Sequence, residues 1–152
     1  MAITFNRELQ VFDLALDGSD LATEDTLAST VLASLLCDRL VEDYEVPPGE
    51  DRRGWWADAY ADIPHKTGSR LWLLVRNKQL PSIVKRCEQY CQEALAWMVT
   101  DKLCAAVTVT AFAVPGSALV AMIKLDLPSG SRNFRFEFDE LQQLWRLAGE
   151  MN

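Results

Sequence analysis

Arginine, tryptophan and aspartate side chains gather in two short stretches of this chain, where they could bind another molecule. Three of the five tryptophans lie in Asp51-Arg52-Arg53-Gly54-Trp55-Trp56 and Gly68-Ser69-Arg70-Leu71-Trp72. Guanidinium groups pair with carboxylates and indole rings fill apolar pockets, so both residue types are enriched at the energetic centres of protein interfaces. The same groups could instead stack on one another and tie a long loop to its own domain. The candidate protein-binding residues are Asp51, Arg52, Arg53, Gly54, Trp55, Trp56, Arg70 and Trp72.

Four cysteines and a single histidine are the residues that could bind a transition metal. Cys87 and Cys91 would lie one turn apart on a helix, while Cys37 and Cys104 are far from them in sequence. A closed zinc site takes four ligands, and no Cys-x-x-Cys pair accompanies His65. We therefore expect no metal and no cofactor, and predict free thiols that pack as small hydrophobic groups in a reducing compartment.

Pairs of carboxylates are the remaining route to catalysis, because the chain has no Gly-x-Ser-x-Gly, no phosphate-cradling glycine loop and no His-Glu-x-x-His motif. A muramidase needs one carboxyl group with a raised pKa and one ionised carboxylate a few ångströms away. The candidates are Glu24, Asp25, Glu42, Asp43, Glu50, Asp51 and Asp58. Among 22 acidic residues such neighbours occur by chance. We therefore predict that the chain is not an enzyme and has no small-molecule substrate.

Length, composition and charge limit the classes of function further. The chain has 152 residues, of which 49% are hydrophobic and 24% charged, as expected for one soluble globular domain over residues 1–152. No run of about 18 apolar residues is present to span a bilayer. The N-terminus lacks the basic start and apolar core of a secretory signal, which favours folding in a cytoplasm. A net charge of −7 argues against nucleic-acid binding, which needs a clustered basic surface.

The first half of the sequence predicts a strand, a helix and a long loop. Apolar residues alternate with polar ones from Phe12 to Asp17, which indicates a half-buried strand before a turn at Gly18. Thr23 can cap a helix that continues to about Arg39, since leucines and valines form one apolar stripe. Prolines then break the pattern, and we predict a loop over residues 42–68, which is long enough to suggest a functional role.

The second half predicts two helices, then three strands and a terminal helix. The apolar run over residues 69–77 fits a buried helix or strand, of which we favour the helix. Pro81 suits the first turn of an amphipathic helix that continues to Thr100 and covers the sheet. Residues 103–114 and 119–127 form a hairpin around Pro115-Gly116-Ser117, and alternating phenylalanines over residues 134–138 form a third strand. Asp139 can cap a short helix whose Leu141, Leu144, Trp145 and Ala148 share a face.

These elements predict an α+β fold in which a small, mainly antiparallel sheet packs with helices and carries one long Arg/Trp-rich loop. Val107, Val109, Ala111 and Ala113 would line one face of the hairpin, but Phe112, Val114, Val120 and Met122 place apolar groups on the other. Either the chain's own helices cover this second face, or another subunit covers it or a foreign strand extends the sheet.

Four motifs occur in one order: Asp20-Leu21-Ala22-Thr23, Asp51-Arg52-Arg53-Gly54-Trp55-Trp56-Ala57-Asp58, Gly68-Ser69-Arg70-Leu71-Trp72-Leu73-Leu74 and Glu93-Ala94-Leu95-Ala96-Trp97. In this order the chain resembles the phage Mu-type baseplate protein family, relatives of the wedge subunit that starts the sheath in contractile tails. The resemblance runs from about Phe12 to Trp97 and is weaker beyond.

The resemblance implies a structural role in the baseplate of a contractile phage or prophage tail. Several copies would surround the tail tube in the virion, after assembly in the cytoplasm of the bacterial host. The implied partners are other wedge proteins and the tail sheath subunit, whose first ring the chain would help to start. We assign the contact with a wedge protein to Arg52, Arg53, Trp55 and Trp56, and the contact with the sheath to an open sheet edge. The alternatives are a tail-associated wall hydrolase and a soluble adaptor unrelated to phage.

Overall fold

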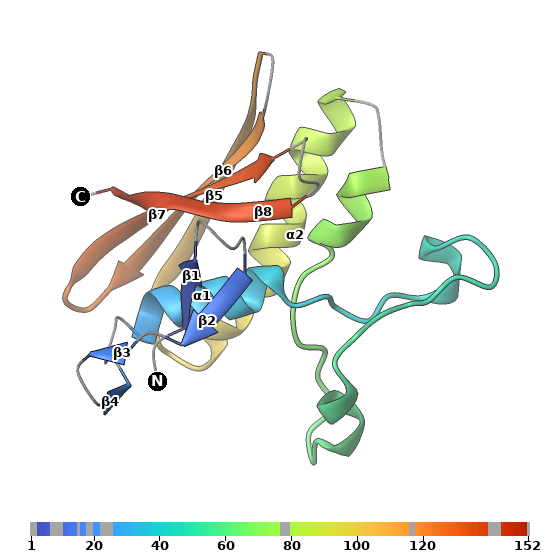
Figure 1. Cartoon of the computed structure of the whole chain (residues 1–152), viewed down its shortest axis with the longest axis horizontal. Coiled ribbons are helices and arrows are strands. Elements are labelled where there is room, and N and C mark those ends of the chain that lie inside the picture. Colours follow the sequence, from blue (N-terminus) through green and yellow to red (C-terminus); the bar gives the residue numbers. More distant parts are fainter. Residues whose placement is uncertain are drawn as a thin grey trace. The chain divides into compact units, whose positions relative to one another are not determined.

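The computed structural model describes residues 3–6, 11–14, 16–17, 20–21, 26–76, 80–115, 118–139 and 144–151 (Figure 1). The chain divides into two compact units, Met1–Ala33 and Ser34–Asn152. The prediction of one domain over residues 1–152 stays a prediction. No helix in the described part of the chain combines the length and apolar character that crossing a membrane requires.

The first unit contains two pairs of short antiparallel strands followed by most of a helix. The elements are β1 (Ile3–Asn6), β2 (Val11–Leu14), β3 (Leu16–Asp17), β4 (Asp20–Leu21) and α1 (Thr26–Leu36). β1 pairs with β2, and β3 pairs with β4. The stretch from Phe12 to Asp17 is extended as predicted, but it is divided into β2 and β3, which belong to separate sheets, and β1 and β4 were not predicted. Gly18 and the Thr23 cap lie outside the described residues, and α1 ends three residues before the predicted Arg39.

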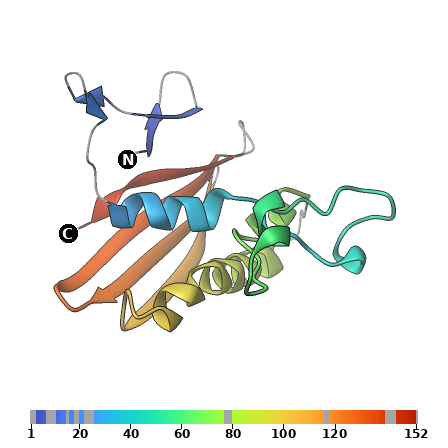
Figure 2. The same cartoon turned by 90° about the horizontal axis from the view of Figure 1, so that it is seen from below.

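The second unit is built on a four-stranded antiparallel sheet, which confirms the α+β class. The strands follow the chain in order: β5 (Ala106–Val114), β6 (Ala118–Leu127), β7 (Gly130–Asp139) and β8 (Leu144–Met151). The predicted hairpin is confirmed, with Val114 opposite Ala118 and Ala106 opposite Asp126. β7 is the predicted third strand, and a tight turn places Leu127 opposite Gly130. Figures 1 and 2 show the sheet from two directions.

The helix α2 (Leu80–Thr100) packs along β5 and covers part of one face of the sheet, as predicted. Its apolar residues recur at intervals of three and four, so they form one stripe. The fully or almost fully buried members of this stripe are Cys87, Cys91, Ala94, Leu95 and Met98. The buried residues that the sheet contributes include Val107, Ala111, Ile123, Leu125, Phe134 and Phe136. The preceding element, η3 (Leu71–Arg76), is a 3-10 helix, so the choice of helix over strand there is confirmed.

The other face of the sheet is more polar than its hairpin residues suggested. Arg135 and Arg146 both pair with Glu137, at 2.8 and 3.2 Å, across β7 and β8. Val120 is buried, while the Phe112 side chain is 40% exposed. Coverage of this face by another subunit stays a prediction.

The C-terminal segment is a strand and not the helix that we predicted. β8 pairs with β7, with Trp145 opposite Phe138 and Leu147 opposite Phe136. The two aromatic rings lie 5.4 Å apart, and Trp145 is buried on this unit, as expected. The helical spacing of Leu144, Trp145 and Ala148 is outweighed by pairing along β7, which satisfies backbone groups that an edge would leave open. Leu141 lies outside the described residues.

The cysteines are free thiols. Cys87, Cys91 and Cys104 are buried, as predicted, but Cys37 is exposed at the end of α1, so the prediction is wrong for that residue. A hydrogen bond with Cys91, together with burial, raises the pKa of the Cys87 thiol, which therefore stays protonated at neutral pH.

Candidate functional site

The Arg/Trp loop, residues 42–68, connects α1 to η3 and projects away from the sheet and α2 (Figures 1 and 2). Most of it is irregular, with two 3-10 turns, η1 (Asp43–Glu45) and η2 (Trp56–Tyr60). The segments at its two ends meet in a parallel bridge between Asp38 and Ser69. There the Arg39 N–H donates to the Ser69 carbonyl (3.0 Å) and the Ser69 N–H donates to the Cys37 carbonyl (2.9 Å). The loop is therefore closed at its base by backbone hydrogen bonds.

Gly68 makes this closure possible. Its φ is +96°, a region that residues with a Cβ rarely adopt. A Cβ at this position would lie 2.3 Å from the Cys37 carbonyl oxygen and 2.8 Å from the Cys37 carbonyl carbon. Next to it, the buried Ser69 hydroxyl donates to the Leu35 carbonyl at the end of α1. Only glycine allows the two ends of the loop to approach this closely.

A small apolar core lies under the base of the loop. Trp72 packs with Val41 and Val46, and Leu73 packs against this cluster. Trp72 is 7% exposed, and its indole N–H donates to the Arg39 carbonyl at 3.1 Å. This candidate site residue therefore lies inside its own unit, where it fixes the segments on both sides of the loop.

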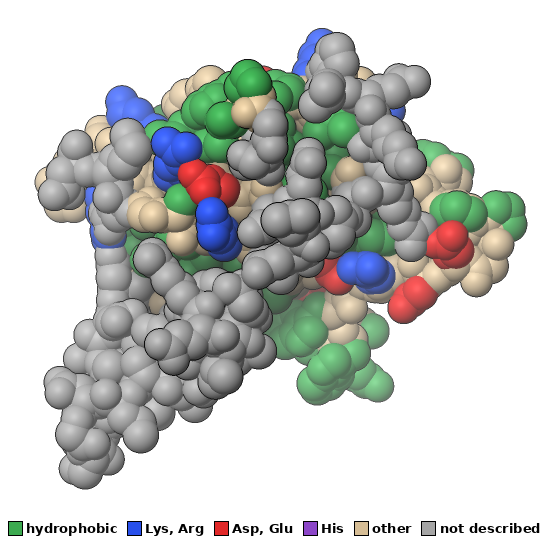
Figure 3. All heavy atoms as spheres, turned by 45° about the horizontal axis from the view of Figure 1, so that its top comes forward, with side chains coloured by type: hydrophobic (Ala, Val, Ile, Leu, Met, Phe, Trp, Pro, Cys, Tyr) green, Lys and Arg blue, Asp and Glu red, His purple; other side chains and the backbone are tan. Residues whose placement is uncertain are grey.

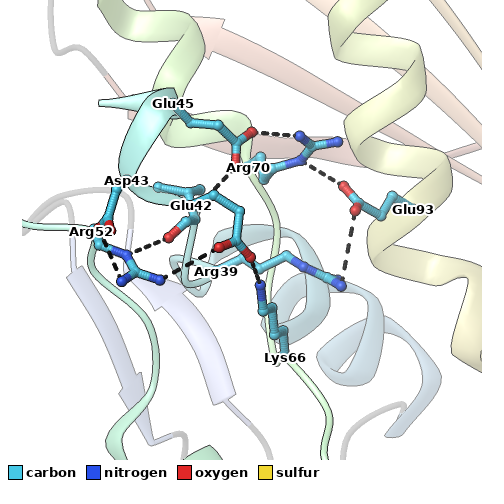
Figure 4. A network of polar contacts seen from close by, with 9 residues as sticks. Arg39, Glu42, Asp43, Glu45, Arg52, Lys66, Arg70 and Glu93 are labelled. Atoms are coloured by element: carbon cyan, nitrogen blue, oxygen red, sulfur yellow. Dashed lines mark hydrogen bonds and ion pairs between the residues drawn. The ribbon is translucent and has the colours of Figure 1, made fainter. Parts of the chain in front are cut away.

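Arg52 is held by three groups of the same loop region (Figure 4). Its Nε donates to the Val41 carbonyl at 2.7 Å, and its guanidinium group pairs with Asp43 at 3.0 Å and with Glu42 at 3.8 Å. The Arg52 carbonyl in turn accepts from the Val41 N–H. The side chain is 37% exposed, so each ion pair contributes little, but the set of contacts orients the guanidinium group inward.

Arg53 stacks on the loop core. Its guanidinium carbon lies 4.5 Å from the Trp72 ring centroid, and its Nη1 bonds to Asp38 at 2.6 Å. The backbone has a positive φ of 55°, and its N–H donates to the Asp51 side chain at 2.8 Å. Gly54 follows with a φ of +101°, where a Cβ would lie 2.7 Å from the Leu40 Cβ. Asp51, Arg53 and Gly54 thus turn the chain against the loop base.

Arg70 connects the loop to α2. It bonds to Glu45 of η1 at 2.7 Å and to Glu93 of α2 at 2.8 Å, and it lies 4.4 Å from the Tyr90 ring centroid. Arg39 pairs with the same Glu93 at 3.9 Å. Figure 4 shows these side chains converging between η1 and α2. Arg70 is therefore placed as an internal brace between the loop and the helix.

Two further contacts hold the returning half of the loop. Lys66 Nζ bonds to Glu42 at 2.6 Å. The Asp58 carboxylate accepts from the Thr67 N–H at 2.7 Å and from its hydroxyl at 2.6 Å, and His65 Nε2 lies 3.2 Å from the same carboxylate. Asp58 therefore joins η2 to the end of the loop.

The aromatic cluster, which we define as Trp55, Trp56 and Tyr60, is exposed on the loop, as are Tyr44 and Ile63. The side chains of the cluster are 49%, 74% and 81% exposed. The Trp55 and Trp56 ring centroids lie 6.2 Å apart, and those of Trp56 and Tyr60 lie 6.1 Å apart, with the last pair edge to face. Sequence reasoning missed Tyr60, although it lies four residues after Trp56 in the same short turn.

Several of the carboxylates considered for a hydrolase make contacts within the loop region. Hydrogen bonding from Lys66, then its positive charge, holds the pKa of Glu42 below its ordinary value, which is the opposite of what a general acid needs. Asp43 pairs with Arg52, and Asp58 with Thr67. Glu24 and Asp25 lie outside the described residues. The positions of these groups match a role in bracing.

The carboxylate of Glu45 makes loop stability depend on pH. Its partial burial alone would raise the pKa, but hydrogen bonds from the Glu42 N–H and from Arg70 outweigh it, and the folded pKa is lowered. A lowered folded pKa means that the group stabilises the fold above its unfolded pKa, about 4.3, and that this stabilisation is lost as pH falls through the folded value. We expect the Glu45→Gln variant to be less stable than the parent at pH 7 and to differ from it less at pH 3. Urea titrations followed by tryptophan fluorescence at each pH will measure this, and parallel pH profiles would contradict it.

Comparison with known proteins gives a consistent result. A model of the family described as "Phage protein GP46" matches residues 27–132, which include the whole Arg/Trp loop and α2. The chain is 43% identical over 121 residues to the baseplate protein gp46 of Escherichia phage Mu, in an alignment that covers 78% of this chain and 82% of that protein. It is 40% identical over 126 residues to the Mu-like prophage FluMu protein gp46 of Haemophilus influenzae, covering 81% of this chain and 87% of the relative.

The match with the family model extends from α1 to β7, farther along the chain than the motifs that first suggested the resemblance. The exposed aromatic cluster and the charged residues around it lie within the matched residues. The chain belongs to the phage protein GP46 family and is a member of the Mu-type baseplate proteins.

Proposed function

We propose that this chain is a structural subunit of the baseplate of a contractile phage or prophage tail, where it joins wedge proteins and helps to start the sheath. Several copies would surround the tail tube in the virion. The observation that carries the proposal is the 43% identity to the baseplate protein of phage Mu, over a span that includes the Arg/Trp loop. The role is one of assembly and involves no reaction.

The contact with a wedge protein is assigned to the Arg/Trp loop. Supporting this assignment, the loop projects from its unit and carries an exposed aromatic cluster on a base closed by hydrogen bonds. Preorganised loops bind more tightly because less conformational entropy is lost on association. Arg52, Arg53, Arg70 and Trp72 would act by holding the loop, and Trp55 and Trp56 by contacting the partner.

The contact with the sheath is assigned to the outer edge of β8. The other edge strand, β5, is occupied by α2: Gln92 Nε2 donates to the Val107 carbonyl at 2.7 Å, and the Ala111 N–H donates to Glu88 at 2.8 Å. Among the described residues no side chain is bonded to the outer backbone edge of β8. A strand added beside β8 could pair with the backbone groups of this edge.

The closed state of the β5 edge is itself testable. Replacing both Glu88 and Gln92 with alanine removes the side chains that bond to the β5 backbone, so we expect concentration-dependent self-association through this edge. The matched control is Gln89→Ala, at an exposed position of the same helix. Sedimentation velocity at several concentrations will measure the effect. A double variant that stays as monodisperse as the control would contradict the capping role.

The experiment that tests the function is reconstitution with the wedge proteins and sheath subunit of the same tail, followed by negative-stain imaging. We expect the purified chain to join baseplate wedges and to be required for the first sheath ring. The Trp55→Ala, Trp56→Ala double variant should stay folded and fail to join. A chain that joins neither assembly would contradict the proposal. Clearing of a cell-wall suspension that depends on one acidic residue would support a hydrolase instead.

A further inference from the structure

We propose that the aromatic cluster docks into an apolar groove bordered by lysine or arginine side chains on the wedge partner, and that the arginines of the motif hold the loop without carrying this contact. The inference rests on the proposed function, and it names the chemistry of the partner surface. It also adds Tyr60 to the residues that make the contact.

The side chains of the aromatic cluster are exposed. Figure 3 shows hydrophobic side chains at the surface of the described residues. Three large aromatic side chains that are each about half exposed or more form a contiguous patch, since neighbouring rings lie 6.2 and 6.1 Å apart. Tryptophan and tyrosine dominate the energetic centres of protein interfaces because they bury a large area with few rotatable bonds. Because the Trp56 and Tyr60 rings meet edge to face, the surface of the patch is uneven, so a groove fits it better than a flat surface.

The arginines of the motifs already have partners within this chain. Arg52 pairs with Asp43, Arg53 with Asp38, and Arg70 with Glu45 and Glu93. A carboxylate on a partner would have to compete with these contacts, and would remove the cation from the Trp72 ring or from the α2 brace. The groove therefore does not depend on acidic side chains for its recognition of the loop.

The charge of the Arg/Trp loop favours a basic partner. The Arg/Trp loop contains seven acidic and three basic residues, and each basic residue pairs with a carboxylate of this chain. Asp51 and Asp62 are exposed, and the Asp43 side chain is 88% exposed although it pairs with Arg52. This acidic surround attracts a basic rim and repels nucleic acid, anionic membranes and a second copy of the same loop. A basic partner protein is the occupant that these charges favour.

The direct test measures binding of the purified chain to the reconstituted wedge protein. We expect Trp55→Ala and Trp56→Ala each to weaken binding at least tenfold, Tyr60→Ala to weaken it severalfold, and Asp62→Lys to slow association. Raising the salt concentration should slow association of the parent chain more than of Asp62→Lys. Trp97→Phe is the matched control, since Trp97 is partly exposed but lies on α2 outside the loop. Circular dichroism will establish that all variants are folded.

A second test needs no wedge protein and uses three synthetic helical peptides as probes. The first has leucines on one face bordered by lysines, the second has the same leucines bordered by glutamates, and the third keeps the lysines but replaces leucine with serine. We expect the first to bind at least tenfold more tightly than the other two, and to lose this advantage with the Trp55→Ala, Trp56→Ala variant. Equal binding of the glutamate-bordered peptide, or of the aromatic variant, would overturn the inference.

The outcomes separate this inference from the proposed function. If the Trp55→Ala, Trp56→Ala, Tyr60→Ala variant enters baseplates as well as the parent does, the docking inference is overturned and the baseplate role remains. If the parent enters no baseplate but selects the leucine and lysine peptide, the baseplate role fails and the docking chemistry remains. Binding of phosphatidylserine vesicles, or self-association that the aromatic variant abolishes, would overturn the choice of a basic protein as the occupant.

Discussion

The Gly68→Ala variant is expected to lose the closed base of the Arg/Trp loop, with a fall in the free energy of unfolding of about 3 kcal/mol or more. Two costs combine. The added Cβ would lie 2.3 Å from the Cys37 carbonyl oxygen, and that contact is with backbone, which cannot rotate away. The φ of +96° is also unfavourable for alanine. Chemical denaturation will measure the change, and proteolysis within residues 42–68 will report whether the loop opens locally.

Gly49→Ala is the matched control for this prediction. Gly49 lies in the same loop and also has a positive φ, +84°, but a Cβ there would meet no atom within 4 Å. Alanine at this position therefore carries only the backbone cost, about 1 kcal/mol. Equal destabilisation by the two substitutions would show that the clash with Cys37 is relieved by a small shift and that closure does not need glycine.

The Trp72→Ala variant is expected to destabilise the second unit by about 3–5 kcal/mol, the usual range for removing a buried tryptophan. The substitution leaves a cavity beside Val41 and Val46, removes the ring under the Arg53 guanidinium group, and leaves the Arg39 carbonyl without its indole donor. Trp72→Phe keeps most of the volume and loses the hydrogen bond, so it should cost about 1 kcal/mol. Urea denaturation followed by far-UV circular dichroism will give both values.

Trp56→Ala is the control for the Trp72→Ala prediction. Trp56 belongs to the same motif, but its side chain is 74% exposed, so its removal should change the free energy of unfolding by no more than about 0.5 kcal/mol. If Trp56→Ala were as destabilising as Trp72→Ala, the aromatic cluster would be part of the folded frame and would no longer qualify as a docking surface.

Much of the fold could be predicted because the governing patterns are local. The stripe of Cys87, Cys91, Ala94 and Met98 recurs with the helical period, and prolines and glycines bracket the loop. In the hairpin of β5 and β6, successive residues alternate between the two faces of the sheet on both sides of one turn. These signals depend on neighbours within a few positions, so one sequence is enough to read them.

The C-terminal strand was missed because its signal is not local. Leu144, Trp145 and Ala148 match a helical spacing, whereas Trp145 and Leu147 match a strand. The choice is made by pairing with β7, including the shift in register between Arg135 and Phe136, which no pattern within β8 reveals. β1 and β4 were also missed, and their pairing with β2 and β3 is likewise not visible within their own residues.

The roles of the motif residues could be predicted only in part, because adjacent residues have different neighbours in space. Arg53 and Trp55 are two positions apart, yet Arg53 lies on Trp72 and pairs with Asp38, while Trp55 is half exposed. The partners of Arg70 come from η1 and α2, 25 and 23 residues away along the chain. The residue types indicated that each of these groups either binds a partner or braces the loop. Only the neighbours of each residue in the fold distinguish between these two roles.

The hydrogen bonds from Glu88 and Gln92 to β5 have a consequence for how copies of this chain can be arranged. A sheet with two available edges can be joined on both sides, so identical molecules can continue side by side into a fibre without limit. With one side sealed by its own helix, each molecule can accept a neighbouring strand once and growth then stops.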